Sequence, residues 1–247
     1  MITIMHMAAQ YLATAAISFI EKKEDDSHTN LGWVDRSLET HPFPNGDSLK
    51  LNYENFSLEW QHQNGNKEHL LLNHKTHKEI VEWISEISKG NGINKPYSYN
   101  LHYELPYPKI SDLTTFNLTS QDRLNDLINH RDLVHQVITH VLKTGGYESS
   151  VRIWPHHFDT GAFFTTHDNL GIGLGMAIPD SLIDDFYLYV SGYKGHDTVE
   201  LPSDTTLEKG SYYSNGWNGF ALPVTGISKE DASLFFTSAI NQYTQSL

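Results

Sequence analysis

The chain has no cysteine. Disulfide bonds, thiolate metal sites and a cysteine nucleophile are therefore excluded. Basic residues are scarce as well, with 17 Lys and Arg against 30 Asp and Glu, which gives a formal net charge of -13. A surface of that sign repels phosphate groups, so the composition disfavours nucleic acid and anionic membranes as partners.

Long apolar runs are also missing. No stretch of 18 consecutive apolar residues occurs, which disfavours a transmembrane helix. Residues 1–20 are apolar enough to resemble a secretory signal, but no Lys or Arg precedes them, and His6, Gln10 and Thr14 interrupt them. Apolar residues at helical spacing favour instead an amphipathic helix of a soluble, cytoplasmic protein. These residues are Met5, Ala8, Leu12, Ala15 and Phe19.

Aromatic residues are plentiful, at 12% of the 247 residues, and disorder is therefore not expected. Both halves of the chain, residues 1–95 and 96–247, have the pattern helix, antiparallel strands, helix. We therefore predict an α+β fold, with antiparallel sheet covered by helices in one compact unit. The two halves represent a weak internal duplication or, alternatively, two unrelated halves that share one sheet.

Strand patterns follow the first helix. Residues 31–38 and 49–61 both have strand composition, and a one-residue phase shift inside the second stretch predicts a bulge or a hairpin. Asn64-Gly65 predicts a further hairpin turn.

The end of the first half has a helix signal and an extended segment. Thr76 and Glu79 have the spacing of a capping box and predict a helix that ends near Gly90. Aromatic and leucine residues alternate strictly with other residues over 97–105, which predicts a strand.

The second half is predicted to begin with a long helix over 120–144 and to end with a helix capped by Ser228. The strands expected between them are 151–157, 162–166, 171–178, 186–190 and 217–222, with a long loop over 191–216. Gly171, Gly173 and Gly175 leave one face of a strand bare. Such a face admits an aromatic ring or a ligand, and we favour the ring.

The densest group of reactive side chains is Trp154-Pro155-His156-His157-Phe158-Asp159. On a strand, His157 and Asp159 share one face, and the three aromatic and imidazole rings share the other. An imidazole beside a carboxylate can move protons or bind a cation, so His157 and Asp159 are the candidate catalytic residues.

Further side chains are candidates for a ligand or a metal ion at the same place. The candidate ligand-binding residues are Trp154, His156, Phe158, His102 and Glu104. The candidate metal ligands are His157, Asp159 and His167, and a divalent metal is the one cofactor that these residues suggest. The alternative to a catalytic or metal-binding site is that His157 and Asp159 form a buried pair with a purely structural role.

Three segments together resemble a bacterial family of unknown function with a W-P-H-H-F-D type motif: residues 37–47, 49–61 and 151–159. The resemblance implies a soluble bacterial α+β protein and no particular activity. In distant members of that family Phe158 and Asp159 have counterparts, whereas the positions of His156 and His157 can hold small residues. The resemblance therefore supports the architecture and weakens a catalytic role for these histidines.

Three functions are compatible with these residues. The leading hypothesis is a protein that binds a small polar ligand in a pocket beside residues 154–159. The first alternative is a metal-assisted hydrolase that uses His157 and Asp159. The second is a non-catalytic structural or interaction protein, and the oligomeric state is left open.

Overall fold

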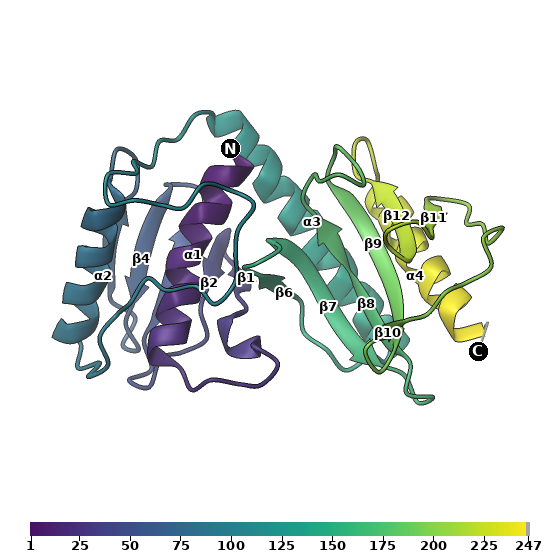
Figure 1. Cartoon of the computed structure of the whole chain (residues 1–247), viewed down its shortest axis with the longest axis horizontal. Coiled ribbons are helices and arrows are strands. Elements are labelled where there is room, and N and C mark those ends of the chain that lie inside the picture. Colours follow the sequence, from purple (N-terminus) through teal and green to yellow (C-terminus); the bar gives the residue numbers. More distant parts are fainter. Residues whose placement is uncertain (246–247) are drawn as a thin grey trace. The chain divides into compact units, whose positions relative to one another are not determined.

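A computed structural model describes residues 1–245 and contains four α-helices and two antiparallel sheets, of five and seven strands. The predicted α+β class is thus confirmed (Figure 1). The chain divides into two compact units. Met1–Asn129 and Ile153–His156 make up the first unit, and His130–Arg152 and His157–Leu247 make up the second.

This division differs from the expected one at residues 95–96. Residues 96–129 belong to the first unit, and the division instead falls within the long helix α3 (Gln121–Gly145). Each unit contains a sheet and helices, whereas the internal duplication stays a prediction.

In the first unit, helix α1 (Ile2–Phe19) lies across the five-stranded sheet, and helix α2 (His77–Gly90) flanks it (Figure 1). The strands follow one another in chain order: β1 (Gly32–Val34), β2 (Ser37–Glu39), β3 (Ser48–Asn52), β4 (Ser57–Gln61) and β5 (Lys67–Leu71). Their apolar side chains face α1. Phe43, in the segment between β2 and β3, contacts both the ring of Phe19 on α1 and the ring of Trp60 on β4.

Four hairpins build this sheet, because each strand pairs antiparallel with the next one in the chain, and two of them were predicted. The phase shift within 49–61 is the β3–β4 hairpin, and Asn64-Gly65 forms the turn between β4 and β5. The single strand expected over 31–38 is wrong, because Asp35 and Arg36 both have positive φ, at 48° and 56°. Two successive left-handed residues make a tight turn that folds the segment into the β1–β2 hairpin.

The capping box of α2 is confirmed. The Glu79 amide donates to Thr76 Oγ1 at 3.3 Å, and the Thr76 amide donates to Glu79 Oε2 at 2.8 Å. Hydrogen bonds to Lys75 and Thr76 hold the pKa of Glu79 down to about 2, so the capping carboxylate stays ionised.

The strand expected over 97–105 is wrong, although its alternation of buried and exposed residues is real. Among residues 1–245 the segment has no strand partner, and it follows α1 instead. Polar residues of α1 that are four residues apart form hydrogen bonds with the tyrosine hydroxyls and the backbone of this irregular segment. The contacts are His6 Nδ1 with Tyr107 Oη at 3.1 Å, Gln10 Oε1 with Tyr103 Oη at 2.7 Å, Thr14 Oγ1 with Tyr97 Oη at 2.7 Å, and the Ser98 amide with Ser18 Oγ at 3.1 Å.

These contacts account for the polar residues that interrupt the apolar helix. Helix α1 is the one helix among residues 1–245 that is long and apolar enough to cross a membrane by composition, and 67% of that window is buried in the protein. His6, Gln10 and Thr14 form a polar stripe that is satisfied inside the unit.

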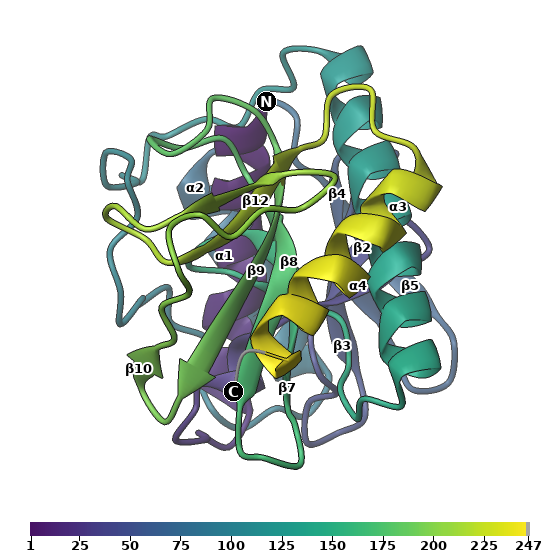
Figure 2. The same ribbon diagram turned by 90° about the vertical axis from the view of Figure 1, so that its right-hand side faces the viewer.

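In the second unit, α3 and α4 (Lys229–Gln245) lie side by side against one face of the seven-stranded sheet (Figure 2). The strand order of this sheet is β11-β12-β9-β8-β7-β6, and β10 pairs with β9. The strands are β7 (Asp159–Thr165), β8 (Gly171–Ala177), β9 (Tyr187–Lys194), β10 (Asp197–Thr198), β11 (Ser211–Tyr213) and β12 (Gly219–Pro223), together with β6 (Arg152–Trp154), whose residues Ile153 and Trp154 belong to the first unit. The loop predicted over 191–216 is therefore partly wrong, because it contains β10, β11 and the end of β9.

The predicted Ser228 cap is confirmed, and Ser120 caps the long helix in the same way. The Arg123 amide donates to Ser120 Oγ at 3.3 Å, and the Asp231 amide donates to Ser228 Oγ at 3.0 Å. The long helix thus begins and ends close to the predicted residues, since it spans Gln121–Gly145.

Candidate functional site

The strand expected over 151–157 is cut short, and this changes the candidate site. Strand β6 ends at Trp154, residues 155–158 form a turn, and β7 begins at Asp159. Phe158 has a φ of 61°, a left-handed conformation that is costly for a bulky residue. The predicted sharing of one face by His157 and Asp159 is therefore wrong, because the turn breaks the alternation.

The turn also divides the motif between the units. Trp154 and His156 belong to the first unit, whereas His157, Phe158 and Asp159 belong to the second. His157 is exposed, and Phe158 and Asp159 are buried.

Arg131 of α3 secures the start of β7 in the second unit. Its side chain is fully buried and donates from Nη1 to Thr160 Oγ1 at 2.6 Å and from Nη2 to the Phe158 carbonyl at 3.1 Å. The guanidinium carbon also lies 4.4 Å from the centre of the Phe158 ring. These contacts offset the cost of the left-handed backbone at Phe158.

Asp159 is a buried carboxyl group in this unit. Tyr189 on β9 donates from its hydroxyl to Asp159 Oδ2 at 2.5 Å, while the buried Asp159 Oδ1 has no hydrogen-bond partner among residues 1–245. Burial raises the pKa of Asp159, although Tyr189, His157 and Arg131 all act to lower it. Burial and the neighbouring carboxylate also raise the pKa of the Tyr189 hydroxyl well above its ordinary value.

The bare glycine face lets Tyr189 reach Asp159. A Cβ atom on Gly175 would lie 2.7 Å from Tyr189 Oη, and one on Gly161 would lie 2.9 Å from it. Phe163 and Tyr193 cover Gly171 and Gly173 in the same way. The prediction that aromatic rings pack on the glycine strip is thus confirmed.

The first unit contains an open cavity of about 530 Å³, and His156, which is not part of its lining, contacts one of the wall residues. The ring of His156 is 6.0 Å from Trp154 and 5.6 Å from Tyr103, and Tyr103 is part of the cavity wall. The wall also contains two predicted ligand-binding residues, His102 and Glu104. The complete lining is Met7, Tyr99, Leu101, His102, Tyr103, Glu104, Leu105, Tyr107, Pro108, Lys109 and Ile110.

Local structure explains why this segment encloses a cavity. Prolines and the missing strand partner prevent it from joining a sheet, and the tyrosine hydroxyls fix it to α1 at intervals. Tyr103 and Tyr107 therefore direct their hydroxyls towards α1 and contribute their rings to the wall.

The predicted metal ligands do not form a cluster. His167 lies exposed in the turn between β7 and β8, and His157 is exposed at the turn before β7. Within residues 1–245 no group of three or more His, Asp or Glu side chains could hold a metal ion.

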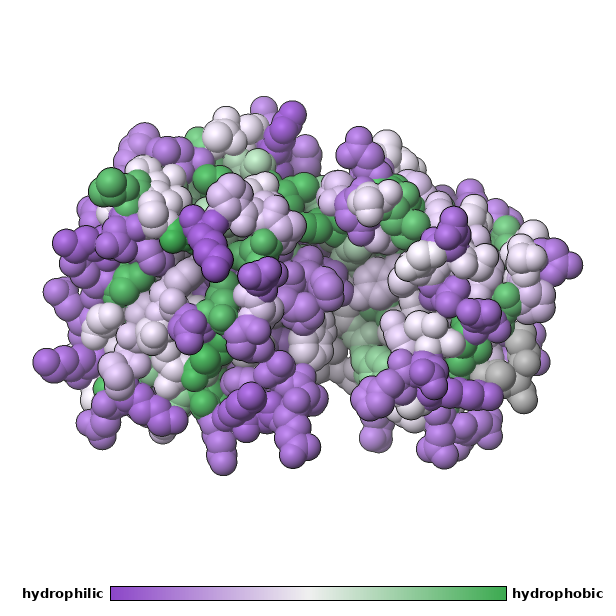
Figure 3. Space-filling model, viewed as in Figure 1, coloured by the Kyte–Doolittle hydropathy of each residue, from purple (hydrophilic) through white to green (hydrophobic). Residues whose placement is uncertain are grey.

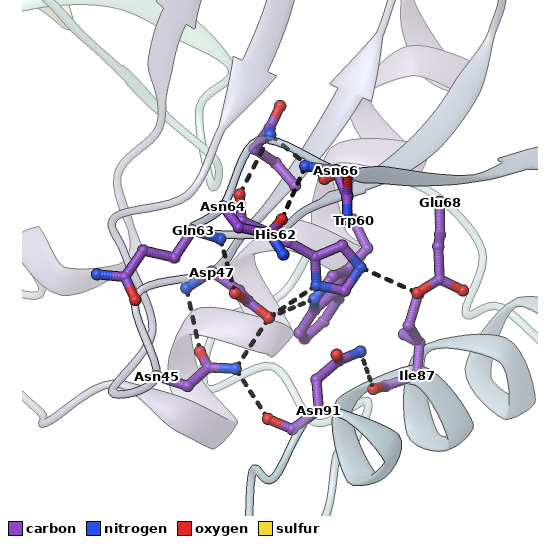
Figure 4. A network of polar contacts seen from close by, with 11 residues as sticks. Asn45, Asp47, Trp60, His62, Gln63, Asn64, Asn66, Glu68, Ile87 and Asn91 are labelled. Carbon is purple, nitrogen blue, oxygen red and sulfur yellow. Dashed lines mark hydrogen bonds and ion pairs between the residues drawn. The ribbon is translucent and has the colours of Figure 1, made fainter.

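A polar network around Asp47 was not predicted from the sequence (Figure 4). Asp47 is buried and accepts from Trp60 Nε1 at 2.8 Å, from Asn45 Nδ2 at 2.9 Å and from the Gln63 amide at 3.0 Å. The imidazole of His62 lies between this carboxylate, at 3.4 Å, and that of Glu68, at 3.0 Å. The network joins two turns of the first unit, and its contacts are accounted for by that structural role.

No protein-family model, curated protein or solved structure matches the chain. The resemblance to a bacterial family thus stays a prediction.

Proposed function

We propose that the protein binds a small polar molecule in the cavity lined by Met7 and residues 99–110. The observation that carries the proposal is the cavity itself, which combines a ligand-sized volume of about 530 Å³ with apolar, aromatic and charged side chains. Small-molecule sites typically measure about 300–1,000 Å³ and have mainly apolar walls with a few polar groups.

Preorganisation of the wall supports this proposal. Hydrogen bonds to His6 and Gln10 hold the rings of Tyr107 and Tyr103 in place before any ligand enters. Binding then costs little side-chain entropy, which favours affinity. Polar residues also surround scattered apolar ones over the visible face of each unit (Figure 3), in keeping with a cytoplasmic protein that meets dissolved metabolites.

A thermal-shift screen against a metabolite collection tests the proposal. A ligand at about 100 times its Kd stabilises the folded state by about 2.7 kcal/mol, which is enough to give a detectable rise in the thermal midpoint. Intrinsic fluorescence reports mainly on the first unit, which holds Trp33, Trp60, Trp83 and Trp154 but not Trp217.

Two matched variants locate the binding site. Leu101→Trp fills the cavity, whereas Leu113→Trp places the same ring at a position that is 84% exposed and outside the lining. We expect the stabilising compounds to lose their effect on Leu101→Trp and to keep it on Leu113→Trp. A screen without hits, or hits that act equally on both variants, would refute the proposal.

A catalytic role for His157 and Asp159 is a second candidate function in the other unit. It is favoured by the buried, unpartnered Oδ1 of Asp159 and by the electrostatic effect of His157 on this carboxyl group. For the metal-assisted form of this role, elemental analysis of protein purified without a His-tag is the test. Metal-free protein that hydrolyses no substrate with any added divalent ion would contradict it.

A further inference from the structure

Some charged side chains of the cavity wall have an oppositely charged partner within the protein, and others do not. His102 Nε2 lies 3.0 Å from Asp26 Oδ2, so this imidazole already has a carboxylate partner. Glu104 and Lys109 form no ion pair or side-chain hydrogen bond with another residue of 1–245, although both line the same cavity. One free carboxylate and one free ammonium group thus border a single space.

The rest of the wall is suited to an apolar ring. Met7, Leu101, Leu105 and Ile110 provide aliphatic surface, and three tyrosine rings provide flat surface. Burial raises the pKa of Tyr99 and Tyr103, so these rings stay neutral and compete with neither charge.

We infer that the cavity binds a zwitterion with an aromatic side chain, of the size of an aromatic amino acid. Its ammonium group pairs with Glu104, its carboxylate pairs with Lys109, and its ring packs against the tyrosines and Met7. A molecule with only one of these charges leaves the other side chain of the protein unused. This inference rests on the proposed function and specifies its ligand class.

Three probes that differ only in charge test the ligand class by isothermal titration calorimetry on the full-length protein. L-Phenylalanine carries both charges, 3-phenylpropanoate lacks the ammonium group, and phenethylamine lacks the carboxylate. An exposed ion pair contributes about 0.2–1 kcal/mol, so we expect L-phenylalanine to bind about 1.4- to 5-fold more tightly than either single-charge probe.

Two variants then assign each charge to its partner. In Glu104→Gln, L-phenylalanine should lose its advantage over 3-phenylpropanoate and keep its advantage over phenethylamine. In Lys109→Met, the reverse should hold. Glu86→Gln and Lys95→Met change exposed charges outside the cavity and should leave all three Kd values unchanged.

The outcomes separate this inference from the proposal beneath it. Two results would overturn the inference that the ligand is a zwitterion. One is that the Kd ratios between the probes are equal in all variants. The other is that phenethylamine binds most tightly, which the net negative charge of the protein alone would favour. If no probe binds while compounds from the screen still distinguish Leu101→Trp from Leu113→Trp, the ligand class is wrong and the cavity stays the site. If the screen makes no such distinction, both fail.

Discussion

Replacing Arg131 with methionine should destabilise the second unit more than any surface substitution. The guanidinium group is fully buried and is the donor to Thr160 Oγ1 and to the Phe158 carbonyl. Methionine has a comparable length and an apolar tip, so Arg131→Met removes the donors without leaving a large void.

The magnitude follows from the two acceptors that lose their donor. A buried polar group left without a partner costs about 1–3 kcal/mol, and the contact of the cation with the Phe158 ring adds up to about 2 kcal/mol. Part of this loss is offset, because the variant no longer carries the desolvation cost of a buried cation. That cost is present in the wild type, where Arg131 Nε has no hydrogen-bond partner among residues 1–245. We expect a net loss of about 3–5 kcal/mol in the free energy of unfolding.

Urea unfolding combined with hydrogen exchange by mass spectrometry measures this loss and its location. Amides of residues 158–165 should lose protection most, because Arg131 holds the start of β7. Arg123→Met on the exposed part of the same helix is the control and should change stability by less than about 0.5 kcal/mol. A loss no larger in Arg131→Met than in the control would refute the reasoning.

Three further perturbations test other parts of the structure. Because burial raises the pKa of Asp159 in the folded state, wild-type stability should fall as the pH rises from the ordinary value of 3.8 through the raised one, and Asp159→Asn should remove this fall in urea titrations at several pH values. An unchanged pH dependence would contradict the burial argument. Thr14→Val leaves the Tyr97 hydroxyl buried without its partner and should cost about 1–3 kcal/mol, whereas adding Tyr97→Phe should cost less than the sum of the two single changes. Additive costs would mean that this contact contributes nothing. Gly175→Ala would place a Cβ 2.5 Å from the Thr160 carbonyl oxygen and should lower stability by about 1–3 kcal/mol, and a thermal midpoint equal to the wild type would contradict this.

The fold was predictable where short-range chemistry decides it. Capping residues such as Thr76 and Ser228 act within one helical turn, and Asn64-Gly65 sets its own hairpin geometry. The glycine strip was also interpretable, because a bare strand face requires a bulky neighbour.

Two predictions failed because alternation does not specify a partner. Residues 97–105 alternate as a strand would, yet their hydroxyl groups bind the polar stripe of α1 rather than a neighbouring strand. In residues 151–157 the turn after Trp154 and the left-handed Phe158 break the alternation, and no local pattern required that conformation.

Arg131 is the residue whose importance the sequence analysis missed, although a signal was present. It falls on the buried stripe of α3, three residues after Ile128 and three before Val134, where a charged residue needs a dedicated partner. The cavity, by contrast, depends on how one irregular segment packs on a helix, and periodicity carries no information about that.

Methyl NMR of the methionines tests the central claim most directly, namely that a small polar molecule binds in the cavity of the first unit. The chain has four methionines, of which Met7 lines the cavity and Met176 lies in the core of the second unit. On titration with L-phenylalanine or a compound from the screen, the Met7 methyl signal, assigned with Met7→Leu, should shift in a saturable way while that of Met176 stays in place. A saturable shift of Met176 with an unmoved Met7 would contradict the account.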